Sequence, residues 1–331
     1  DLFIGASVMP FLYGMSPVSF LMINNGEGVF KPAINWLGSS VFNNPTRVRP
    51  GMVKDAIWTN LNSDELPDLI LVGEWIPITI LIQKTDHSFL NTTNEFALES
   101  TNGLWNTIAS SDFNMDGKPD FVVGNLGLNS RVEANLSKPL QMYLGDFDSN
   151  GGSDHILVYY NNDRSYPFAS RDQLIKQIPS LKKKFPTYKA YRDVKLEDII
   201  TPNQKGNSAR MSIEELRSVL LISNDSTYKI IELPIEAQHF PVFAIEVADL
   251  NADGFEDLLL TGNLSATQPD FGSYDAGVGL MLTGDGKGNF GAVPPLESGF
   301  VTIGEGRGIK SLSTPSGAVY LVARNNNSIL A

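Results

Sequence analysis

The segment DFNMDGKPD, residues 112–120, decides the fold, because it predicts a cation-binding loop that leads directly into a strand. Oxygen-bearing side chains stand at positions 1, 3, 5 and 9 of this segment, and glycine stands at position 6. Hard cations such as Ca²⁺ take six or more oxygen ligands, and a tight turn lets alternate side chains point inward. The apolar run at residues 121–124 follows at once and is typical of a buried strand. The predicted ligands are the side chains of Asp112, Asn114, Asp116 and Asp120 and the backbone carbonyl of Lys118.

The same pattern occurs twice more, at residues 146–154 (DFDSNGGSD) and 249–257 (DLNADGFED), and an apolar run follows each copy. Three such matches favour Ca²⁺ binding over the alternative, in which the carboxylates only cap hydrated turns. An EF-hand is a poorer interpretation, because no Glu stands at position 12 and strands follow the loops instead of helices. The further predicted ligands are Asp146, Asp148, Asn150, the carbonyl of Gly152, Asp154, Asp249, Asn251, Asp253, the carbonyl of Phe255 and Asp257.

Two weaker copies extend the series. Residues 60–68 (NLNSDELPD) carry Glu65 in place of the glycine and only two carboxylates at the four ligand positions, so we expect weak or no metal binding there. Asp1 fits position 9 of a fifth copy, which is followed by the short apolar run at residues 2–4. We therefore expect the chain to begin within a repeat.

The spacing of the repeats predicts a β-propeller. The position-9 aspartates are separated by 67, 52, 34 and 103 residues. Removing a helical insertion, which we place at residues 161–216, leaves a period of about 50 residues, as in propeller blades. Residues 21–30 also align without gaps on residues 281–290, each a strand, a glycine-rich hairpin and a closing Phe. We predict an all-β fold in which residues 1–331 form the propeller, incomplete at its N-terminus.

The predicted insertion is basic and helical. Ser170 and Gln173 form a capping box, and Pro179 is expected to end the helix that they begin. Eight of the 25 Lys and Arg residues fall in residues 164–192. One interpretation is a solvated helical face. The other is a docking surface for an acidic partner, an anionic glycan or a lipid headgroup.

Composition excludes several classes of function. The chain has 331 residues and a formal net charge of −12, which argues against general nucleic-acid binding. It contains no cysteine, so disulfides, thiol nucleophiles and thiolate metal sites are excluded. No apolar run approaches the length of a transmembrane helix.

Taken together, the loop, the strand and the Gly-x-Gly-x-Phe hairpin resemble the FG-GAP/VCBS repeat family. More narrowly, residues 146–160, 165–191, 274–290 and 321–326 are similar to the C-terminal part of the ASPIC/UnbV and cartilage-acidic-protein group of Bacteroidetes surface proteins. This resemblance implies a propeller with Ca²⁺ in its blade loops. It also implies a surface lipoprotein at the extracellular face of the outer membrane, or a secreted protein.

The leading functional hypothesis is a non-catalytic, calcium-stabilised propeller that binds a protein or glycan at the cell surface. The resemblance suggests an accessory subunit of an outer-membrane transporter or secretion complex as one setting. The alternative is a calcium-dependent polysaccharide lyase or hydrolase, although His87, His155 and His239 lie in no recognisable catalytic motif. Trp36 and Trp75 are candidates for stacking on sugars, and core packing is the competing interpretation.

Overall fold

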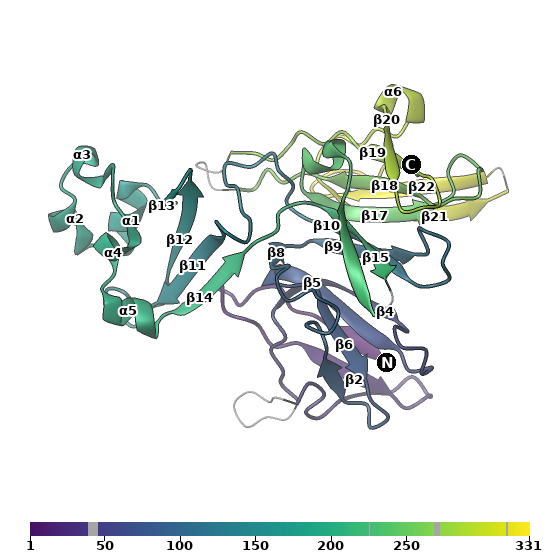
Figure 1. The fold of residues 1–331 in the computed structure, drawn as a ribbon, viewed down its shortest axis with the longest axis horizontal. Coiled ribbons are helices and arrows are strands. Elements are labelled where there is room, and N and C mark those ends of the chain that lie inside the picture. Colours follow the sequence, from purple (N-terminus) through teal and green to yellow (C-terminus); the bar gives the residue numbers. More distant parts are fainter. Residues whose placement is uncertain (39–45, 225, 268–271, 316) are drawn as a thin grey trace. The chain divides into compact units, whose positions relative to one another are not determined.

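The fold is mainly β, as predicted. The computed structural model describes residues 1–38, 46–224, 226–267, 272–315 and 317–331 (Figure 1). It divides into two compact units. Unit 1 comprises Asp1–Ser7, Pro17–Arg131 and Leu216–Ala331, and unit 2 comprises Val8–Ser16 and Val132–Glu215. In the described part of the chain, no helix is both long and apolar enough to cross a membrane.

Among its described residues, unit 1 forms five antiparallel sheets that follow one another along the chain. The first contains β1 (Leu2–Ile4), β2 (Phe20–Asn24) and β3 (Phe30–Pro32), and the second contains β4 (Met52–Thr59), β5 (Asp68–Ile76), β6 (Thr79–Gln83) and β7 (Phe89–Asn91), with β8 (Gly103–Leu104) beside β5. The third contains β9 (Thr107–Ser111), β10 (Asp120–Gly124), β15 (Val219–Asn224) and β16 (Thr227–Glu232). The fourth contains β17 (Val242–Ala248), β18 (Asp257–Gly262), β19 (Leu280–Gly284) and β20 (Phe290–Val293), and the fifth contains β21 (Gly306–Thr314) and β22 (Gly317–Arg324). Two short helices, η1 (Ile235–Gln238) and α6 (Pro295–Ser298), complete the unit.

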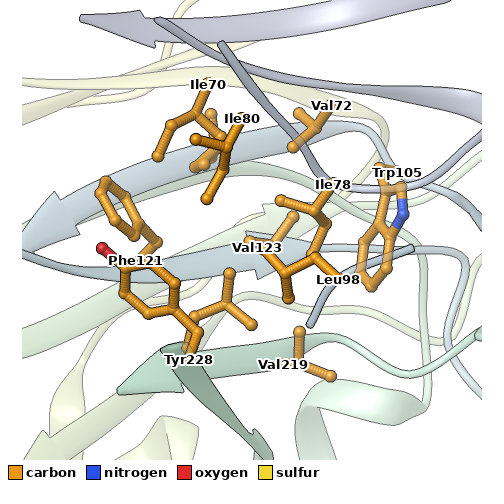
Figure 2. Packing of buried hydrophobic residues seen from close by; sticks show 12 residues of the cluster. Ile70, Val72, Ile78, Ile80, Leu98, Trp105, Phe121, Val123, Val219 and Tyr228 are labelled. Atoms are coloured by element: carbon orange, nitrogen blue, oxygen red, sulfur yellow. The ribbon is translucent and has the colours of Figure 1, made fainter. Parts of the chain in front are cut away.

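The second strand of each middle sheet is apolar on both faces, because successive side chains point to opposite sides of a strand. On β5, Ile70 and Val72 pack with Phe121 of β10, whereas Leu69 and Leu71 pack toward β2. Figure 2 shows the first of these clusters, with Ile70 and Ile80 above Phe121 and Tyr228. The third and fourth sheets pack in the same way through Val122 and Leu258, and the fourth and fifth through Leu259 and Ile309.

The first strands of successive sheets also lie next to one another. Strand β9 contacts both β4 and β17, and β17 contacts β21. Carboxylates bridge two of these junctions. Asp55 of β4 accepts hydrogen bonds from the backbone N–H of Ile108 and the hydroxyl of Thr107, both at 3.0 Å. Glu246 of β17 accepts from the backbone N–H of Ser311 at 3.0 Å and pairs with Lys310 at 3.1 Å.

Unit 2 has a sheet and a core of its own. Its strands are β11 (Leu140–Gly145), β12 (Asp154–Asn161), β13 (Arg164–Pro167) and β14 (Ala209–Ile213), in the order β13-β12-β11-β14. Five short helices follow β13: α1 (Arg171–Gln177), α2 (Leu181–Lys184), α3 (Tyr188–Tyr191), α4 (Leu196–Ile199) and α5 (Pro202–Asn207). Their apolar side chains pack onto the sheet, where Leu174, Phe185 and Leu196 meet Tyr143 and Ile156.

The structure places the insertion differently from the sequence-based prediction. The capping box of Ser170 and Gln173 is present at the start of α1, as predicted. However, unit 2 takes in residues 132–215, not only 161–216, and it contains the 146–154 loop. The chain leaves the third sheet after β10 and returns at β15, so the inserted segment separates two strands that pair side by side.

Two tryptophans considered as sugar-stacking residues belong to the core. Trp36 is fully buried, and its ring meets Phe3 and Phe89 in edge-to-face contacts. Trp75 is also buried. Hydrophobic packing therefore accounts for both rings, and neither presents a face for a sugar.

Glu305 ties the last sheet to the loop that follows β18. Its carboxylate accepts from the backbone N–H of Ser265 at 2.6 Å, from the Ser265 hydroxyl, and from the amide of Asn325 at 2.7 Å. It also pairs with Arg307 at 2.8 Å. The hydrogen bonds from Ser265 and Asn325 lower the pKa of Glu305 to about 2.

We therefore expect the contribution of Glu305 to stability to depend on pH. A lowered pKa means that the stabilisation is fully present above the ordinary Glu range and is lost as pH falls toward about 2. The measurement is the urea midpoint of wild type and Glu305→Gln, followed by tryptophan fluorescence. All four tryptophans lie in unit 1, so the signal reports that unit alone. The gap between the two midpoints should be constant from pH 7 to 5 and shrink below about pH 4.5. A gap that stays constant to pH 3 would contradict the assignment, and Glu236→Gln, at an exposed position, controls for net charge.

Candidate calcium loops

Four loops of the described chain share one backbone conformation. They are residues 60–68, 112–120, 146–154 and 249–257, and each connects the first and second strands of a hairpin. Positions 4 and 6 have positive φ in all four loops. At position 4, φ is 58° for Ser63, 60° for Met115, 62° for Ser149 and 61° for Ala252, and at position 6 it is 66° for Glu65, 81° for Gly117, 82° for Gly151 and 88° for Gly254.

The 60–68 loop adopts this conformation without the glycine. A non-glycine residue with positive φ is strained by about 1–2 kcal/mol, because its Cβ approaches the backbone. Glu65 nevertheless keeps the turn, so the surrounding strands impose the loop conformation even where the sequence does not favour it. The four loops are therefore similar in backbone conformation as well as in amino-acid sequence.

In the three loops that have Asp at position 1 and Gly at position 6, residues 112–120, 146–154 and 249–257, the position-1 carboxylate organises the turn. Asp112 accepts from the backbone N–H groups of Asp116 at 3.0 Å and Gly117 at 2.8 Å. Asp146 and Asp249 accept from the equivalent N–H groups of their own loops. These bonds hold the acidic side chains inside the turn, where they remain exposed or half-buried, apart from the position-9 residue.

The position-9 aspartate is an anchor between strands. Asp120 is fully buried, and its two oxygens accept from the backbone N–H of Phe113 at 3.0 Å and from that of Ser223, on β15, at 2.7 Å. Asp257 is bound in the same way by Leu250 and Gly284. Asp68 is bound likewise by Leu61 and Gln83.

Asp1 makes one of these two contacts. It accepts from the backbone N–H of Asn24 at 3.0 Å, and Asn24 is the residue that aligns with Gly284. This contact supports the assignment of Asp1 to position 9 of a repeat. It also relates the hairpins at residues 24–30 and 284–290 in space as well as in sequence.

Electrostatics separate the buried aspartate from its neighbours in the loop. Burial raises the pKa of Asp120. Hydrogen bonds from Ser223 and Phe113 offset this rise only in part, and repulsion from Asp116 and Asp112 adds to it. Burial likewise raises the pKa of Asp68. For Asp116, burial acts in the same direction, but hydrogen bonds from the Lys118 N–H, Asn114 and Ser223 outweigh it and lower the pKa. A bound cation would favour the ionised form of all these carboxylates.

The 146–154 loop brings its carboxylates closest together. One oxygen each from Asp146, Asp148 and Asp154 lie within 4.8 Å of one another, and no other three acidic or histidine side chains of the described residues gather in this way. Asp154 is buried and accepts one hydrogen bond, from the Phe147 N–H at 2.9 Å. Its second oxygen has no hydrogen-bond donor among the described residues, unlike those of Asp120 and Asp257.

The predicted ligands of the 112–120 and 249–257 loops occupy equivalent positions, but their carboxylates do not form such a cluster. In the 112–120 and 249–257 loops, position 3 is an amide, and it donates to the position-5 carboxylate, from Asn114 to Asp116 at 3.0 Å and from Asn251 to Asp253 at 2.9 Å. In both loops the position-9 oxygens are already bound by two N–H groups. The 146–154 loop is therefore the strongest candidate metal centre.

A third copy of the closing hairpin was not predicted from the sequence. The hairpin of residues 83–89 has the same pairing as the two glycine-rich hairpins, because Gln83 pairs with Phe89 as Asn24 pairs with Phe30 and Gly284 with Phe290. It contains no glycine, so the Gly-x-Gly-x-Phe pattern does not detect it. The sequence signal shared by the three hairpins is the spacing of six residues between the residue whose N–H binds the position-9 aspartate and the Phe that closes the hairpin.

Comparisons with known proteins assign no family. No family model matches the chain, and no curated protein matches it. Among solved structures, the biofilm matrix protein Bap1 of V. cholerae is similar with 9% sequence identity and a TM-score of 0.31, covering 92% of this chain. The chain spans 65% of the length of that structure. A TM-score of this size does not establish a shared fold, so we draw no conclusion from the similarity.

Replacing Asp120 by Asn should destabilise unit 1 even without metal. The amide keeps one acceptor oxygen, but its NH₂ group would face a backbone N–H that Asp120 now accepts. Leaving that buried N–H unpaired costs about 1–3 kcal/mol. The measurement is the urea midpoint in EDTA by tryptophan fluorescence, with the exposed Asp275→Asn as control. Equal midpoints for the two variants would show that Asp120 is not an anchor.

Replacing Gly151 by Ala should destabilise unit 2 through the backbone alone. A Cβ at Gly151 meets no atom within 4 Å, but φ is 82°, so the cost is about 1–2 kcal/mol of backbone strain. Gly206 in α5 is the matched control, since it also has open space but no positive φ, and Gly206→Ala should be neutral or stabilising. Thermal unfolding followed by circular dichroism at 222 nm includes unit 2 through α1–α5, whereas tryptophan fluorescence does not. A Gly151→Ala melting temperature at or above that of Gly206→Ala would contradict this account.

Proposed function

We propose that this chain is a non-catalytic, calcium-stabilised β-propeller protein of the cell surface, built from FG-GAP/VCBS-type blades, which binds a protein or glycan partner. One observation carries the proposal. The same acidic loop, with the same backbone conformation, recurs at the start of strands that are buried on both faces. Turn preference alone does not require the same carboxylate pattern at each repeat.

The order of the sheets in unit 1 supports the propeller part of the proposal. Propeller blades are four-stranded antiparallel sheets that pack face to face around an axis, with their first strands innermost. Here the successive sheets pack face to face in chain order, and β4, β9, β17 and β21 adjoin one another. The end sheets of the series, β1-β2-β3 and β21-β22, have fewer than four strands among the described residues.

The chemistry of the loops supports calcium over a smaller cation. Each of the three loops with Asp at position 1 and Gly at position 6 offers carboxylate, amide and carbonyl oxygens on a flexible turn, and such oxygen-rich sites suit Ca²⁺ better than the rigid octahedron that Mg²⁺ requires. The ion would offset the repulsion among three carboxylates placed within one turn. Extracellular modules bind Ca²⁺ at roughly 10⁻⁴–10⁻³ M, which agrees with a cell-surface or secreted protein.

The 146–154 loop would connect a bound metal ion to the helices of unit 2. The carbonyl of Phe147, inside the loop, accepts from the side chain of Gln204 in α5 at 2.9 Å. The carbonyl of His155, which follows the loop, accepts from Gln177 of α1 at 3.1 Å. Calcium at Asp146, Asp148 and Asp154 would therefore stabilise both ends of the helical layer.

Calcium removal tests the proposal in both units. We expect about 5 mM Ca²⁺, compared with EDTA, to raise the unfolding temperature by fluorescence and by circular dichroism, and Mg²⁺ to have little effect. Affinities in the extracellular range give about 1–2 kcal/mol for each occupied loop at that concentration. The double variant Asp146→Asn/Asp148→Asn should reduce the rise seen by circular dichroism and keep the rise seen by fluorescence.

The double variant Asp163→Asn/Asp193→Asn is the matched control for charge in unit 2, since both residues are exposed and lie outside the loops. It should retain both calcium-dependent rises. A wild-type chain that shows no calcium-specific rise by either signal would contradict the calcium-stabilised propeller.

A further inference from the structure

The strongest charge asymmetry of the molecule lies in helices α1–α3 of unit 2. Residues 171–192 contain seven Lys and Arg and one acidic residue, whereas the whole chain has a formal net charge of −12. The single acid, Asp172, is bound internally, because it pairs with Arg171 at 2.6 Å and accepts from the hydroxyl of Tyr188 at 2.5 Å. The local positive charge is therefore not neutralised by acids of the same segment.

The arginines and the lysines of this segment have different roles. Arg171 donates to the carbonyls of Phe185 and Pro186, which fastens α1 to the link between α2 and α3. Arg192 pairs with the neighbouring Asp193 at 2.9 Å. By contrast, the side chains of four exposed lysines form no ion pair or hydrogen bond with any described residue: Lys176, Lys182, Lys183 and Lys189. We call these four residues the lysine surface.

The helices that carry the four lysines are fixed to the core of unit 2. Leu174, Ile178, Leu181 and Phe185 of the same segment are buried in the core of unit 2. Tyr191 of α3 donates to the carbonyl of Ala169 at 2.7 Å, and Lys184 of α2 donates to the carbonyl of Asp198 at 2.5 Å. A ligand that contacts the lysines therefore has to order only the lysine side chains, which lowers the entropic cost of binding.

The composition of this surface points to a hydrated, highly charged ligand. Among the described residues of 171–192, Tyr188 is the one large apolar side chain that is exposed, and its hydroxyl is bound to Asp172. One aromatic ring does not make the cluster of apolar anchors that a protein interface or membrane insertion requires. The unpaired cations are lysines, which act as point charges and do not provide the planar fork with which arginine binds a carboxylate. Charge density, and not bidentate geometry, is what such a surface recognises.

We propose that the lysine surface binds a sulfated polysaccharide. Sulfate groups carry a full charge at all physiological pH values, and a polymer of them meets several lysines at once, so weak contacts add up along the chain. The inference does not require metal in the loops, and it gives the proposed surface protein a specific class of partner.

The test is calorimetric titration of the full chain with dextran sulfate and with uncharged dextran of the same length. We expect binding to dextran sulfate only, and a marked loss of affinity between 50 and 300 mM salt, because exposed charges are screened. Replacing all four residues of the lysine surface by Gln should weaken binding by about tenfold or more, given the modest contribution of each exposed charge. These side chains are exposed and unpaired, so the variant should keep the wild-type circular dichroism spectrum.

A variant with the same change of net charge provides the control. Lys31, Lys84, Lys229 and Lys287 are exposed and lie in unit 1, and replacing them by Gln should change the affinity less than twofold. Equal losses in the two variants, or no binding by the wild-type chain at 50 mM salt, would overturn the proposal. Binding to anionic lipid vesicles in its place, or equally strong binding to the carboxylated polymer hyaluronate, would also overturn it.

The experiment is performed in EDTA and again in calcium. Sulfated-polymer binding without calcium-dependent stabilisation would refute the proposed function alone. Calcium-dependent stabilisation with no binding to dextran sulfate would refute this inference alone. Salt-sensitive self-association of the chain in sedimentation, lost in the lysine-surface variant and without dextran sulfate binding, would assign the surface to a second copy and overturn the proposal.

Discussion

The arrangement of unit 1 depends on a buried carboxylate that joins three segments of chain. In three sheets, the aspartate at the end of the acidic loop accepts from an N–H inside its own loop and from an N–H at the end of the third strand. A buried carboxylate is costly unless such donors satisfy it. Once they do, the loop, the second strand and the third strand hold a fixed register, and the apolar faces of the sheet are aligned with those of the next sheet.

This interaction also explains why position 9 is the most constant part of the loop. The 60–68 loop lacks the glycine and has one carboxylate fewer than the other three loops, yet Asp68 remains, fully buried and with both oxygens bound. The main role of the position-9 aspartate is therefore to stabilise the sheet. The residues at positions 1, 3 and 5 are exposed or half-buried, so a cation from solvent can reach them.

The sequence was informative where local chemistry determines the structure. The acidic loops, the doubly apolar strands and the capping box at Ser170 depend on residues within a few positions of one another, and all three are present as elements in the structure. The extent of the insertion was not predictable in the same way. Residues 146–160 repeat the loop-strand pattern, so nothing local distinguishes a sheet of unit 2 from a sheet of unit 1. Only the pairing of β10 with β15 makes the distinction, and that is a long-range fact.

The position of unit 2 between β10 and β15 has a consequence for folding. Asp120 and Ser223, which bond to each other, are 103 residues apart, so the third sheet has the longest-range closure of those anchored this way. Such contacts slow folding, because a long segment has to be ordered before they form. Until synthesis reaches β15, the apolar faces of β10 lack a partner strand on one edge. The bond from the Gly127 N–H to the Leu216 carbonyl at 2.8 Å holds the two ends of the inserted segment together. A unit 2 that folds early with its ends close would shorten the effective loop and let the third sheet close as if it were a local hairpin.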